Sequence, residues 1–386
     1  MTLGAIVFGV SGLVLSGGFV RDIFVQLGEA LIHSQSGHLQ VSALGYSSYG
    51  SRSPDKYLIG DPQLLKRQIA AMPDVEDVMM RIQFSGLLNN GRTDWPVFGE
   101  GVEPSKEAKL SSFMHVINGR QLSDKDQFGV VVGQGVAKAL KLSPGDRVTL
   151  LLNTAEGALN TLDLEVVGVF QSFSKDFDAR AIRISLPAAQ ELLGLRGVNT
   201  MVVALRQTSA TERVAAELIA TLDGKKVEVR TWRQLNDFYD KTVALYEQQF
   251  GFLQLIILGM VLLSVANSVN ISVHERVGEF GTMMALGNSA NYVRRLILSE
   301  TAMLGLVGSV LGIALGVTLA ISISAAGIPM PPPPNSNLGY TGLIRVVPSV
   351  LAIAFAVGSI ATILAGVPPA LRVSRMPIVD ALRANV

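Results

Sequence analysis

Four long stretches of the chain are apolar and almost free of charged residues. They cover residues 2–20, 250–273, 296–328 and 346–371, and Glu300 is the one charged residue inside them. A helix needs about 20 apolar residues to cross the hydrocarbon core of a bilayer. The pattern therefore predicts four transmembrane helices, and an even number of crossings places both chain ends on the same side of the membrane.

The first apolar stretch has a second interpretation, a secretory signal peptide. Such a leader begins with basic residues and has an apolar core of about 7–15 residues. No Lys or Arg precedes Arg21, and the stretch 2–20 is longer than that core. We therefore interpret it as a membrane span. A span without a basic leader is unusual, and a short cytoplasmic segment missing from this sequence is one explanation.

The chain between the first two spans has a different pattern. Residues 21–249 contain the charges, turns and short alternating stretches of a soluble domain. Both ends of this part, 21–36 and 232–249, have helical apolar spacing and run into the spans without a turn residue. We interpret them as two stalk helices that carry one α+β domain, in which two strand–helix–strand halves flank a β-rich insertion.

The sequence thus predicts a membrane α-helical protein with four transmembrane helices and a large extracytoplasmic α+β domain on two stalk helices. The predicted segments are a first span (1–20), a stalk helix (21–36), the α+β domain (37–231, with the insertion at about 86–197), a second stalk helix (232–249), a second span (250–273), a loop (274–295), a third span (296–328), a Pro-rich loop (329–345), a fourth span (346–371) and a tail (372–386).

Basic residues in the short loops predict the orientation, because cytoplasmic loops carry an excess of Lys and Arg. The loop 274–295 and the tail 372–386 each contain several arginines, whereas the Pro-rich loop 329–345 contains only Arg345. The first two segments are therefore predicted to be cytoplasmic. The Pro-rich loop and the large domain are predicted to lie on the outer side.

Composition and missing motifs exclude several kinds of chemistry. The chain has no cysteine, which excludes disulfides, thiolate metal ligands and a cysteine nucleophile. Its formal net charge of +1 gives no general attraction for nucleic acid. A phosphate-binding GxxxxGK[ST] loop is absent, since Gly224 and Lys225 lack the glycine that should precede them. The four histidines are scattered. We expect a non-catalytic chain without a cofactor or metal site of its own.

Small residues in the spans predict close helix packing. Gly308, Gly312 and Gly316 stand four residues apart in the third span, and Gly12 and Ser16 form a weaker version in the first. Small residues at this spacing allow the backbones of two membrane helices to approach closely. The three glycines are therefore predicted to form a tight helix interface.

Glu300 is a functional candidate because ionisable residues inside membrane spans are costly. It follows Arg295 closely, near the predicted membrane interface. We interpret it as a packed or interfacial side chain, since a proton-driven carrier would need several such groups near the middle of the membrane.

The loop between the second and third spans carries a specific motif. Residues 270–287 read NISVHERVGEFGTMMALG, which closely resembles the V-x-E-R-x-x-E-[IF]-G-x-x-x-A-x-G signature of FtsX/MacB-type permeases of ABC transporters, with a LolC/LolE-like layout. Glu300, the glycines after it and the tail 368–383 also resemble this family, and residues 119–146 are similar to the MacB-type periplasmic core. The resemblance covers essentially the whole chain. It departs at the N-terminus, where the family usually has a basic cytoplasmic helix.

The motif also has a physical interpretation. It predicts a short helix with large apolar side chains on one face, ended by a glycine C-cap, and such a helix can occupy a groove of a partner. The resemblance implies that the partner is a cytoplasmic ABC ATPase dimer, which binds ATP and Mg²⁺, and that this is the coupling helix. The residues assigned to ATPase coupling are Glu275, Arg276, Glu279, Phe280, Gly281, Met283, Met284, Ala285 and Gly287, with Leu286 completing the apolar face.

The resemblance implies a mechanotransmitting permease in the bacterial inner membrane, with its large domain in the periplasm. Its partners would be the ATPase, a second permease subunit in a homodimer or heterodimer, and a periplasmic carrier or membrane-fusion protein. Its task would be the extraction or export of a lipophilic, lipidated or periplasmic substrate. The alternative is an FtsX-like signalling subunit that activates a periplasmic cell-wall hydrolase. The length of the domain between spans one and two favours the transporter.

Overall fold

The computed structural model describes residues 2–50, 56–110, 112–154, 157–222, 226–332, 336 and 339–377. Gly224, Lys225 and the tail beyond residue 377, including Arg383, lie outside these ranges. The chain divides into two compact units. The helical unit comprises Met1–Val25, Thr242–Met330 and Thr341–Val386, and the sheet unit comprises Gln26–Lys241 and Pro331–Tyr340.

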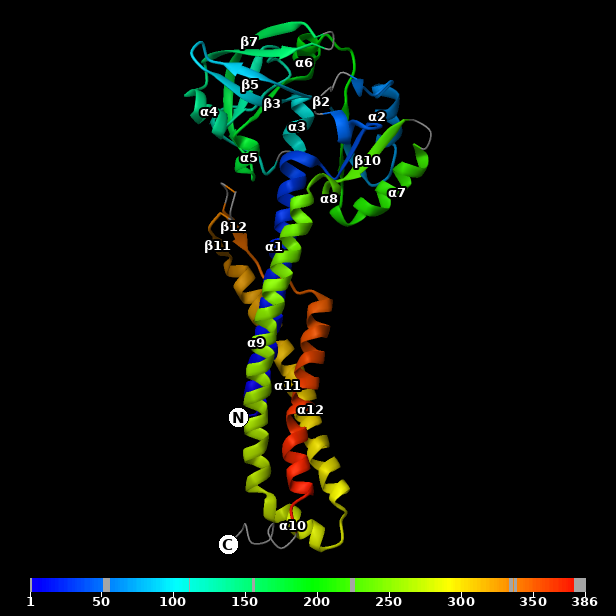
Figure 1. The fold of residues 1–386 in the computed structure, drawn as a ribbon, viewed down its shortest axis with the longest axis vertical. Coiled ribbons are helices and arrows are strands. Elements are labelled where there is room, and N and C mark those ends of the chain that lie inside the picture. Colours follow the sequence, from blue (N-terminus) through cyan, green and yellow to red (C-terminus); the bar gives the residue numbers. More distant parts are fainter. Residues whose placement is uncertain are drawn as a thin grey trace. The chain divides into compact units, whose positions relative to one another are not determined.

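Four helices in the described part of the chain are long and apolar enough to cross a membrane (Figure 1). They are α1 (Thr2–Leu31), α9 (Asp237–Glu275), α11 (Ala290–Ala326) and α12 (Pro348–Ser374). The short helix α10 (Val277–Ala285) lies between α9 and α11. Two short strands, β11 (Ile328–Met330) and β12 (Tyr340–Gly342), lie in the connection between α11 and α12.

The interior of the helical unit is built mainly from β-branched and small residues. Val10 and Val14 of α1, Val269 of α9 and Ala365 of α12 belong to one buried cluster. The opposite faces of the long helices expose leucine, isoleucine and methionine, for example Leu263, which is 70% exposed. An apolar outer face of this kind is suited to lipid, and the helices α1, α9, α11 and α12 therefore form the membrane part of the protein.

The sheet unit is an α+β structure. Ten of its described strands form one sheet in the order β10-β1-β9-β2-β3-β8-β5-β7-β4, with β6 paired to β2 and β7. The strands are β1 (Leu39–Ala43), β2 (Val75–Asn89), β3 (Asp94–Val102), β4 (His115–Gly119), β5 (Gly129–Gly133), β6 (Arg147–Asn153), β7 (Leu159–Gln171), β8 (Ala181–Ser185), β9 (Thr200–Leu205) and β10 (Val227–Thr231).

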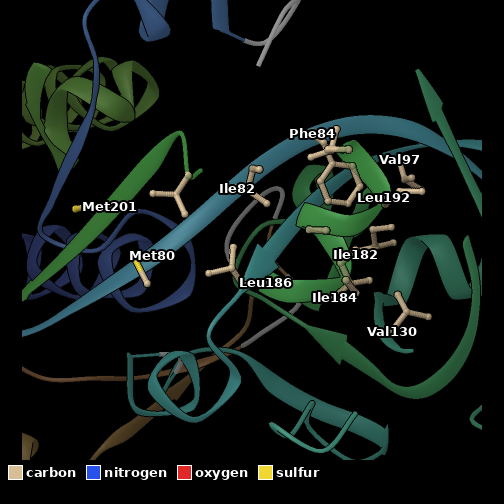
Figure 2. Close-up of a cluster of buried hydrophobic side chains, with 14 of the residues drawn as sticks. Met80, Ile82, Phe84, Val97, Val130, Ile182, Ile184, Leu186, Leu192 and Met201 are labelled. Carbon is tan, nitrogen blue, oxygen red and sulfur yellow. The ribbon is translucent and has the colours of Figure 1, made fainter. Parts of the chain in front are cut away.

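The long strand β2 connects the two halves of this sheet. Its first part pairs with β9, up to Arg81 opposite Thr200, and its second part pairs with β3 from Ile82 onward. The side chains of Ile82 and Phe84 enter a buried cluster that also contains Ile184 of β8 (Figure 2). One strand therefore passes through both halves and contributes to their shared core.

Helices cover the sheet at several points. The helices of the sheet unit are α2 (Pro62–Ala70), α3 (Pro104–Leu110), α4 (Gln134–Leu140), α5 (Lys175–Asp178), α6 (Leu186–Leu193), α7 (Thr211–Thr221) and α8 (Trp232–Leu235). α6 packs on β2, β3 and β8 and places Leu192 in the core (Figure 2). The sequence pattern did not predict α3 or α6. The signal for α6 was its start, where Ser185 caps the helix and Pro187 occupies its first turn.

The predicted stalk helix over 232–249 is wrong in one respect. The structure has a short α8, a break at Asn236, and then α9 from Asp237. Asn236 has φ −125° and ψ 66°, and its side-chain amide donates to the Trp232 carbonyl at 2.7 Å. Asparagine favours such local bonds over a continued helix, which explains a break that apolar spacing alone does not reveal.

The first stalk changes its hydrogen bonding at its end. α1 runs unbroken to Leu31 and is followed by a π-helical turn, Ile32–Ser36. Gly37 ends this turn with φ +63°, and its N–H donates to the Ile32 carbonyl at 3.0 Å. The predicted helical range 21–36 therefore contains two kinds of helix.

Candidate functional site: the short helix α10 and the spans that hold it

The short helix α10 is separated from its neighbours by defined turns. α9 ends at Glu275, and Arg276 leaves the helical conformation before α10 begins. At the other end, Gly287 has φ +99°, its N–H donates to the Met284 carbonyl at 3.1 Å, and the Asn288 N–H donates to the Met283 carbonyl at 3.1 Å. These two bonds form a Schellman cap, and they satisfy carbonyls that the helix end would leave unpaired.

The large side chains of α10 do not all face outward. Phe280 is 1% exposed and Met284 is 8% exposed, and both belong to the buried cluster of the helical unit. The expectation that these residues form a face open to a partner is therefore wrong. Their spacing places them on the core side of α10, where they pack with residues such as Val293 and Val373.

The remaining coupling residues lie on the open side of the same loop. Leu286 is 81% exposed, and Glu275, Glu279, Ala285 and Gly287 are also exposed. Arg276 and Met283 are half-buried, whereas Gly281 is buried. The loop therefore offers a small outer surface of mixed acidic and apolar character, centred on Leu286, backed by a helix face that is fixed in the protein's own core.

Arg276 joins α10 to the next span. Its Nε donates to Glu279 Oε2 at 2.9 Å, and its Nη1 donates to Glu300 Oε2 at 2.9 Å. The guanidinium also lies 5.2 Å from the centre of the Phe280 ring. We call these four residues the Arg276 cluster. Glu300 of α11 thus pairs with Arg276, which agrees with the interpretation of Glu300 as a packed or interfacial side chain.

The three glycines of α11 lie directly against α1. A Cβ atom at Gly308 would stand 2.8 Å from an Ile6 side-chain carbon, and one at Gly312 would stand 2.7 Å from Val10 Cβ. At Gly316 the corresponding distance to Val14 Cβ is 3.0 Å. The two sets share a four-residue spacing, so the glycine face of α11 receives the β-branched face of α1.

Two polar contacts reinforce this helix packing. Ser11 Oγ of α1 donates to the Gly312 carbonyl at 2.9 Å, and Ser359 Oγ of α12 donates to Ser309 Oγ of α11 at 3.3 Å. The weaker small-residue pair of the first span behaves differently, because Gly12 has nothing within 4 Å of the position of a Cβ. That glycine faces open space and makes no tight interface within the described chain.

Asp22 fixes the opposite end of the helical unit. It is fully buried and accepts hydrogen bonds from the Leu343 N–H at 2.9 Å and from Arg345 Nε at 2.8 Å. Arg345 is the basic residue of the Pro-rich loop. The ion pair therefore ties α1 to the segment that leads into α12, at the end away from α10 (Figure 1).

Sequence reasoning missed an apolar cavity of about 270 Å³ between three spans, which is open on one side because lining residues such as Leu255 and Ile353 are exposed. Its lining residues are Leu13 and Gly17 of α1, Gly251, Gln254, Leu255 and Leu258 of α9, and Val350, Ile353, Ala354 and Val357 of α12. Gln254 is the one residue of this set with a polar side chain. A volume of this size accepts part of an acyl chain or a small apolar molecule. Such a cavity has no signal in one sequence, because all its lining residues except Gln254 resemble ordinary lipid-facing ones.

The residues that the structure describes contain no assembled metal site. No group of three or more His, Asp or Glu side chains in these ranges is arranged to hold a metal ion. The helical unit thus contains a short helix that packs against the spans, and an apolar cavity between three of them.

Comparison with known proteins identifies both parts of the chain. Residues 1–221 match the MacB-like periplasmic core domain, and residues 251–378 match the FtsX-like permease C-terminal region. LolE of Haemophilus influenzae, a lipoprotein-releasing system transmembrane protein, is 21% identical over 68% of this chain and 64% of its own length. LolC of Neisseria meningitidis, also a lipoprotein-releasing system transmembrane protein, is 23% identical over 84% of this chain and 77% of that protein.

A relative of a different layout is also similar. The macrolide export ATP-binding/permease protein MacB of Escherichia coli is 26% identical over 69% of this chain, but the match spans only 41% of MacB. The chain thus spans less than two thirds of LolE and less than half of MacB. Two family regions that together cover most of the described chain, with four spans and an α+β domain in the expected order, show that the chain belongs to the family of permeases with a MacB-like periplasmic core domain and an FtsX-like C-terminal region.

Proposed function

We propose that this chain is the permease subunit of an ATP-driven transporter, and that a separate cytoplasmic ABC ATPase acts on its α10 loop. The observation that carries this proposal is the division of α10 into two faces. Phe280 and Met284 connect the helix to the core of the spans, while Leu286 stands 81% exposed at its end. A partner that moves this outer surface would therefore move α9 and α11 as well.

The basic residues support the cytoplasmic assignment of this end. Arg276, Arg294 and Arg372 all lie in or beside the α10 loop or at the end of α12, and Arg372 bonds to Asn270 of α9 at 3.3 Å. An excess of arginine marks the cytoplasmic side. On this assignment the protein is a multi-pass protein of the bacterial inner membrane, with the sheet unit in the periplasm.

The apolar cavity supports a lipophilic or lipidated substrate. Its lining belongs to α1, α9 and α12, so motion of these helices would change its shape. The names of the similar proteins include lipoprotein release and macrolide export. We favour a substrate that carries an acyl chain, because the cavity has an apolar lining with a single polar group at Gln254.

The assembly needs further chains. One permease chain with four spans would pair with a second, either a copy of itself or a paralogue, and with two ATPase subunits that bind ATP and Mg²⁺. A periplasmic carrier or membrane-fusion protein would receive the substrate. This chain itself would bind no cofactor and hydrolyse no ATP.

The ATPase contact is tested by replacing Leu286 with aspartate. The side chain is so exposed that α10 should keep its packing, but a partner groove would then have to bury an unpaired charge. We expect ATPase binding to weaken by about tenfold or more. The control is Leu159→Asp, which makes the same change at a leucine of the sheet unit that is 69% exposed. Capture of the ATPase by both variants at the wild-type level would contradict the proposed contact.

The substrate class is tested in the cavity. Ile353→Trp should fill it, and Ile360→Trp is a matched control, because both isoleucines lie on α12, are 60% and 56% exposed, and only Ile353 lines the cavity. We expect Ile353→Trp alone to abolish cross-linking to a diacylated peptide that carries a photoreactive acyl chain. Equal cross-linking in the two variants would remove the cavity from the mechanism, and ATP-dependent activation of a cell-wall hydrolase by both would favour the signalling alternative.

A further inference from the structure

The sheet unit buries four charged side chains in one cluster, which we call the charge cluster: Arg81, Glu100, Glu107 and Arg183. Their exposed fractions are 0%, 2%, 4% and 3%. Charges are rarely buried this completely unless they are paired, and here two guanidinium groups balance two carboxylates. The cluster uses residues from β2, β3, α3 and β8, which are far apart in the sequence.

Each arginine of the charge cluster contacts both carboxylates. Arg81 donates to Glu107 through two nitrogens, with Nε at 3.2 Å from Oε2, and lies 3.3 Å from Glu100 Oε1. Arg183 Nε donates to Glu100 Oε2 at 2.7 Å, and its Nη1 lies 3.3 Å from Glu107 Oε1. The four groups therefore form a closed ring of ion pairs, whose geometry is more restrictive than that of a single pair.

The charge cluster also contacts the backbone of the π-helical turn that follows α1. Arg81 Nη1 donates to the Gln35 carbonyl at 2.6 Å, and Arg183 Nη2 donates to the Ser34 carbonyl at 3.3 Å. Both carbonyls belong to the π-helical turn Ile32–Ser36. His33 of the same turn adds a contact to α3, since its Nδ1 lies 3.3 Å from the Leu110 carbonyl.

Arg81 lies at the point where strand β2 changes its pairing partner. Arg81 is the last β2 residue that pairs with β9, and the next residue is the first that pairs with β3. Arg183 lies in β8 directly opposite Glu100 of β3. The charge cluster thus touches the junction between the two halves of the sheet, and a force applied to residues 34 and 35 reaches both halves through it.

Two side chains of the π-helical turn have polar atoms without hydrogen-bond partners in the described structure. Ser34 Oγ and Gln35 Nε2 are buried and have no hydrogen-bond partner among the described residues. Buried polar atoms without partners are destabilising, and π-helical turns occur often at functional sites. The two arginines hold the turn in this conformation through its carbonyls, although its own side chains are not satisfied.

We propose that Arg81 and Arg183, oriented by Glu100 and Glu107, form the joint that transmits movement of α1 to both halves of the periplasmic sheet. The four residues are positioning residues, because they act on the π-helical turn and touch no substrate in this proposal. The inference rests on the proposed function, in which ATP-driven motion enters through α10 and leaves through the stalk helices.

The test removes each backbone contact in a charge-balanced way. Arg183→Met with Glu100→Gln removes the donor to Ser34, and Arg81→Met with Glu107→Gln removes the donor to Gln35; each pair of changes deletes one cation and one anion. The control is Lys66→Met with Glu103→Gln, which removes an ion pair of 2.7 Å in the same unit that makes no bond to residues 32–36 in the described structure.

Two measurements on the full chain in lipid nanodiscs separate a joint from a merely structural cluster. The first is amide hydrogen exchange of residues 32–37, which we expect to accelerate by about tenfold or more in both cluster variants and to stay unchanged in the control. The second is the amount of a diacylated peptide that the assembled complex moves per ATP hydrolysed. We expect this ratio to fall by about tenfold in the cluster variants while the ATPase rate persists.

If the cluster variants do not fold, a deletion variant still tests the proposal. Deleting Gln35 shortens the π-helical turn to an α-helical one and moves its carbonyls, while all four charges remain paired. We expect this deletion to preserve the thermal unfolding midpoint within a few degrees and to lose transport per ATP.

Failure of the proposed joint and failure of the proposed function give different results. Folded variants, including the deletion, that move substrate at the wild-type ratio would overturn the joint. Unchanged exchange at residues 32–37 in the cluster variants would also overturn it, because the arginines would then not hold the turn. If the wild-type chain neither binds an ATPase nor moves substrate, the proposed function fails, and the exchange measurement still decides whether the charge cluster controls the turn.

Discussion

Arg276 holds helix α10 through several contacts that are individually weak. Its two carboxylate partners, Glu279 and Glu300, are 59% and 43% exposed, and exposed ion pairs are typically worth about 0–1 kcal/mol. The cation–π contact with Phe280 adds about 0.5–1 kcal/mol at such a site. Because all three contacts share one guanidinium, their main effect is to fix the angle between α10 and α11.

His38 is a second residue whose environment has a measurable consequence. It is 2% exposed, its Nδ1 accepts the Leu205 N–H at 3.1 Å, and its Nε2 lies 3.2 Å from Thr208 Oγ1. These partners assign the proton to Nε2. Burial, with a smaller contribution from the positive charge of His33, lowers the pKa of His38 to about 4.

This pKa predicts acid sensitivity. An unfolded histidine takes up a proton below about pH 6.5, whereas folded His38 does so only near pH 4, so stability is lost as the pH falls through that window. At pH 5 we expect a loss of about 2 kcal/mol relative to pH 7.5. Thermal unfolding of the full chain should show the loss, and His38→Asn should reduce it. His274→Asn, a change at an exposed histidine, should leave it intact; equal pH dependence in all three proteins would refute this account of His38.

Single residues are also where sequence reasoning reached its limit. Arg276 and Glu279 pair across three residues of the coupling motif, so their contact involves only neighbouring positions in the chain. Arg81, Glu100 and Arg183 could not be linked in this way, since only the strand register of β2, β3 and β8 brings them together. Nor could the motif say that Phe280 faces inward, because an apolar helix face fits a protein's own core as well as a partner.

Helices and strands were more predictable from the sequence than contacts between single residues. The physical reasons differ for helices and strands. The spans follow from charge-free stretches, which a bilayer requires and a soluble core does not. Most strands of the sheet unit follow from alternating patterns bounded by turns. The helix α6 was missed because it is short, and the break between α8 and α9 was missed because one asparagine side chain decides it.

The glycines of α11 predict a strong positional effect on helix packing. Gly312→Ala adds a methyl group 2.7 Å from Val10 Cβ, so α1 and α11 must separate or shift. Overpacking of this kind costs about 1–3 kcal/mol. We expect a lower thermal unfolding midpoint in detergent for Gly312→Ala, and no decrease for Gly12→Ala, where nothing lies within 4 Å. Equal midpoints for the two variants would mean that the α1–α11 contact is loose.

The molecule as a whole combines a helical membrane unit with a sheet unit. α1 and α9 are single helices of 30 and 39 residues that belong partly to each unit. At 1.5 Å per residue, about 20 residues suffice to cross the hydrocarbon core, so each helix has length to spare. This excess is what a stalk requires.

The orientation of the whole chain gives a prediction that requires no partner. The chain lacks cysteine, so single cysteines can be introduced without a background. Lys125→Cys in the sheet unit should react with a membrane-impermeant maleimide in intact spheroplasts, and Asn288→Cys beside α10 should react only after permeabilisation; both positions are exposed. Labelling of Asn288→Cys in intact spheroplasts would reverse the orientation and remove α10 from the cytoplasm.

In the proposed function, α9 would carry ATP-driven movement as a stiff helix. This is tested by replacing Val243, Ala244 and Leu245 together with glycine, and by a matched variant in which Val243 and Leu245 are replaced with alanine beside the native Ala244. Each interior glycine costs about 1 kcal/mol relative to alanine, so the glycine variant has a soft segment in a helix of unchanged length.

The decisive measurement is the amount of substrate moved per ATP hydrolysed, on complexes of equal abundance and from the same preparations. The account predicts that the alanine variant keeps the wild-type ratio, whereas the glycine variant continues to hydrolyse ATP and moves about tenfold less substrate per ATP. A glycine variant that moves substrate at the wild-type ratio would contradict the account, because α9 would then be a tether and the sheet unit would not be driven through it.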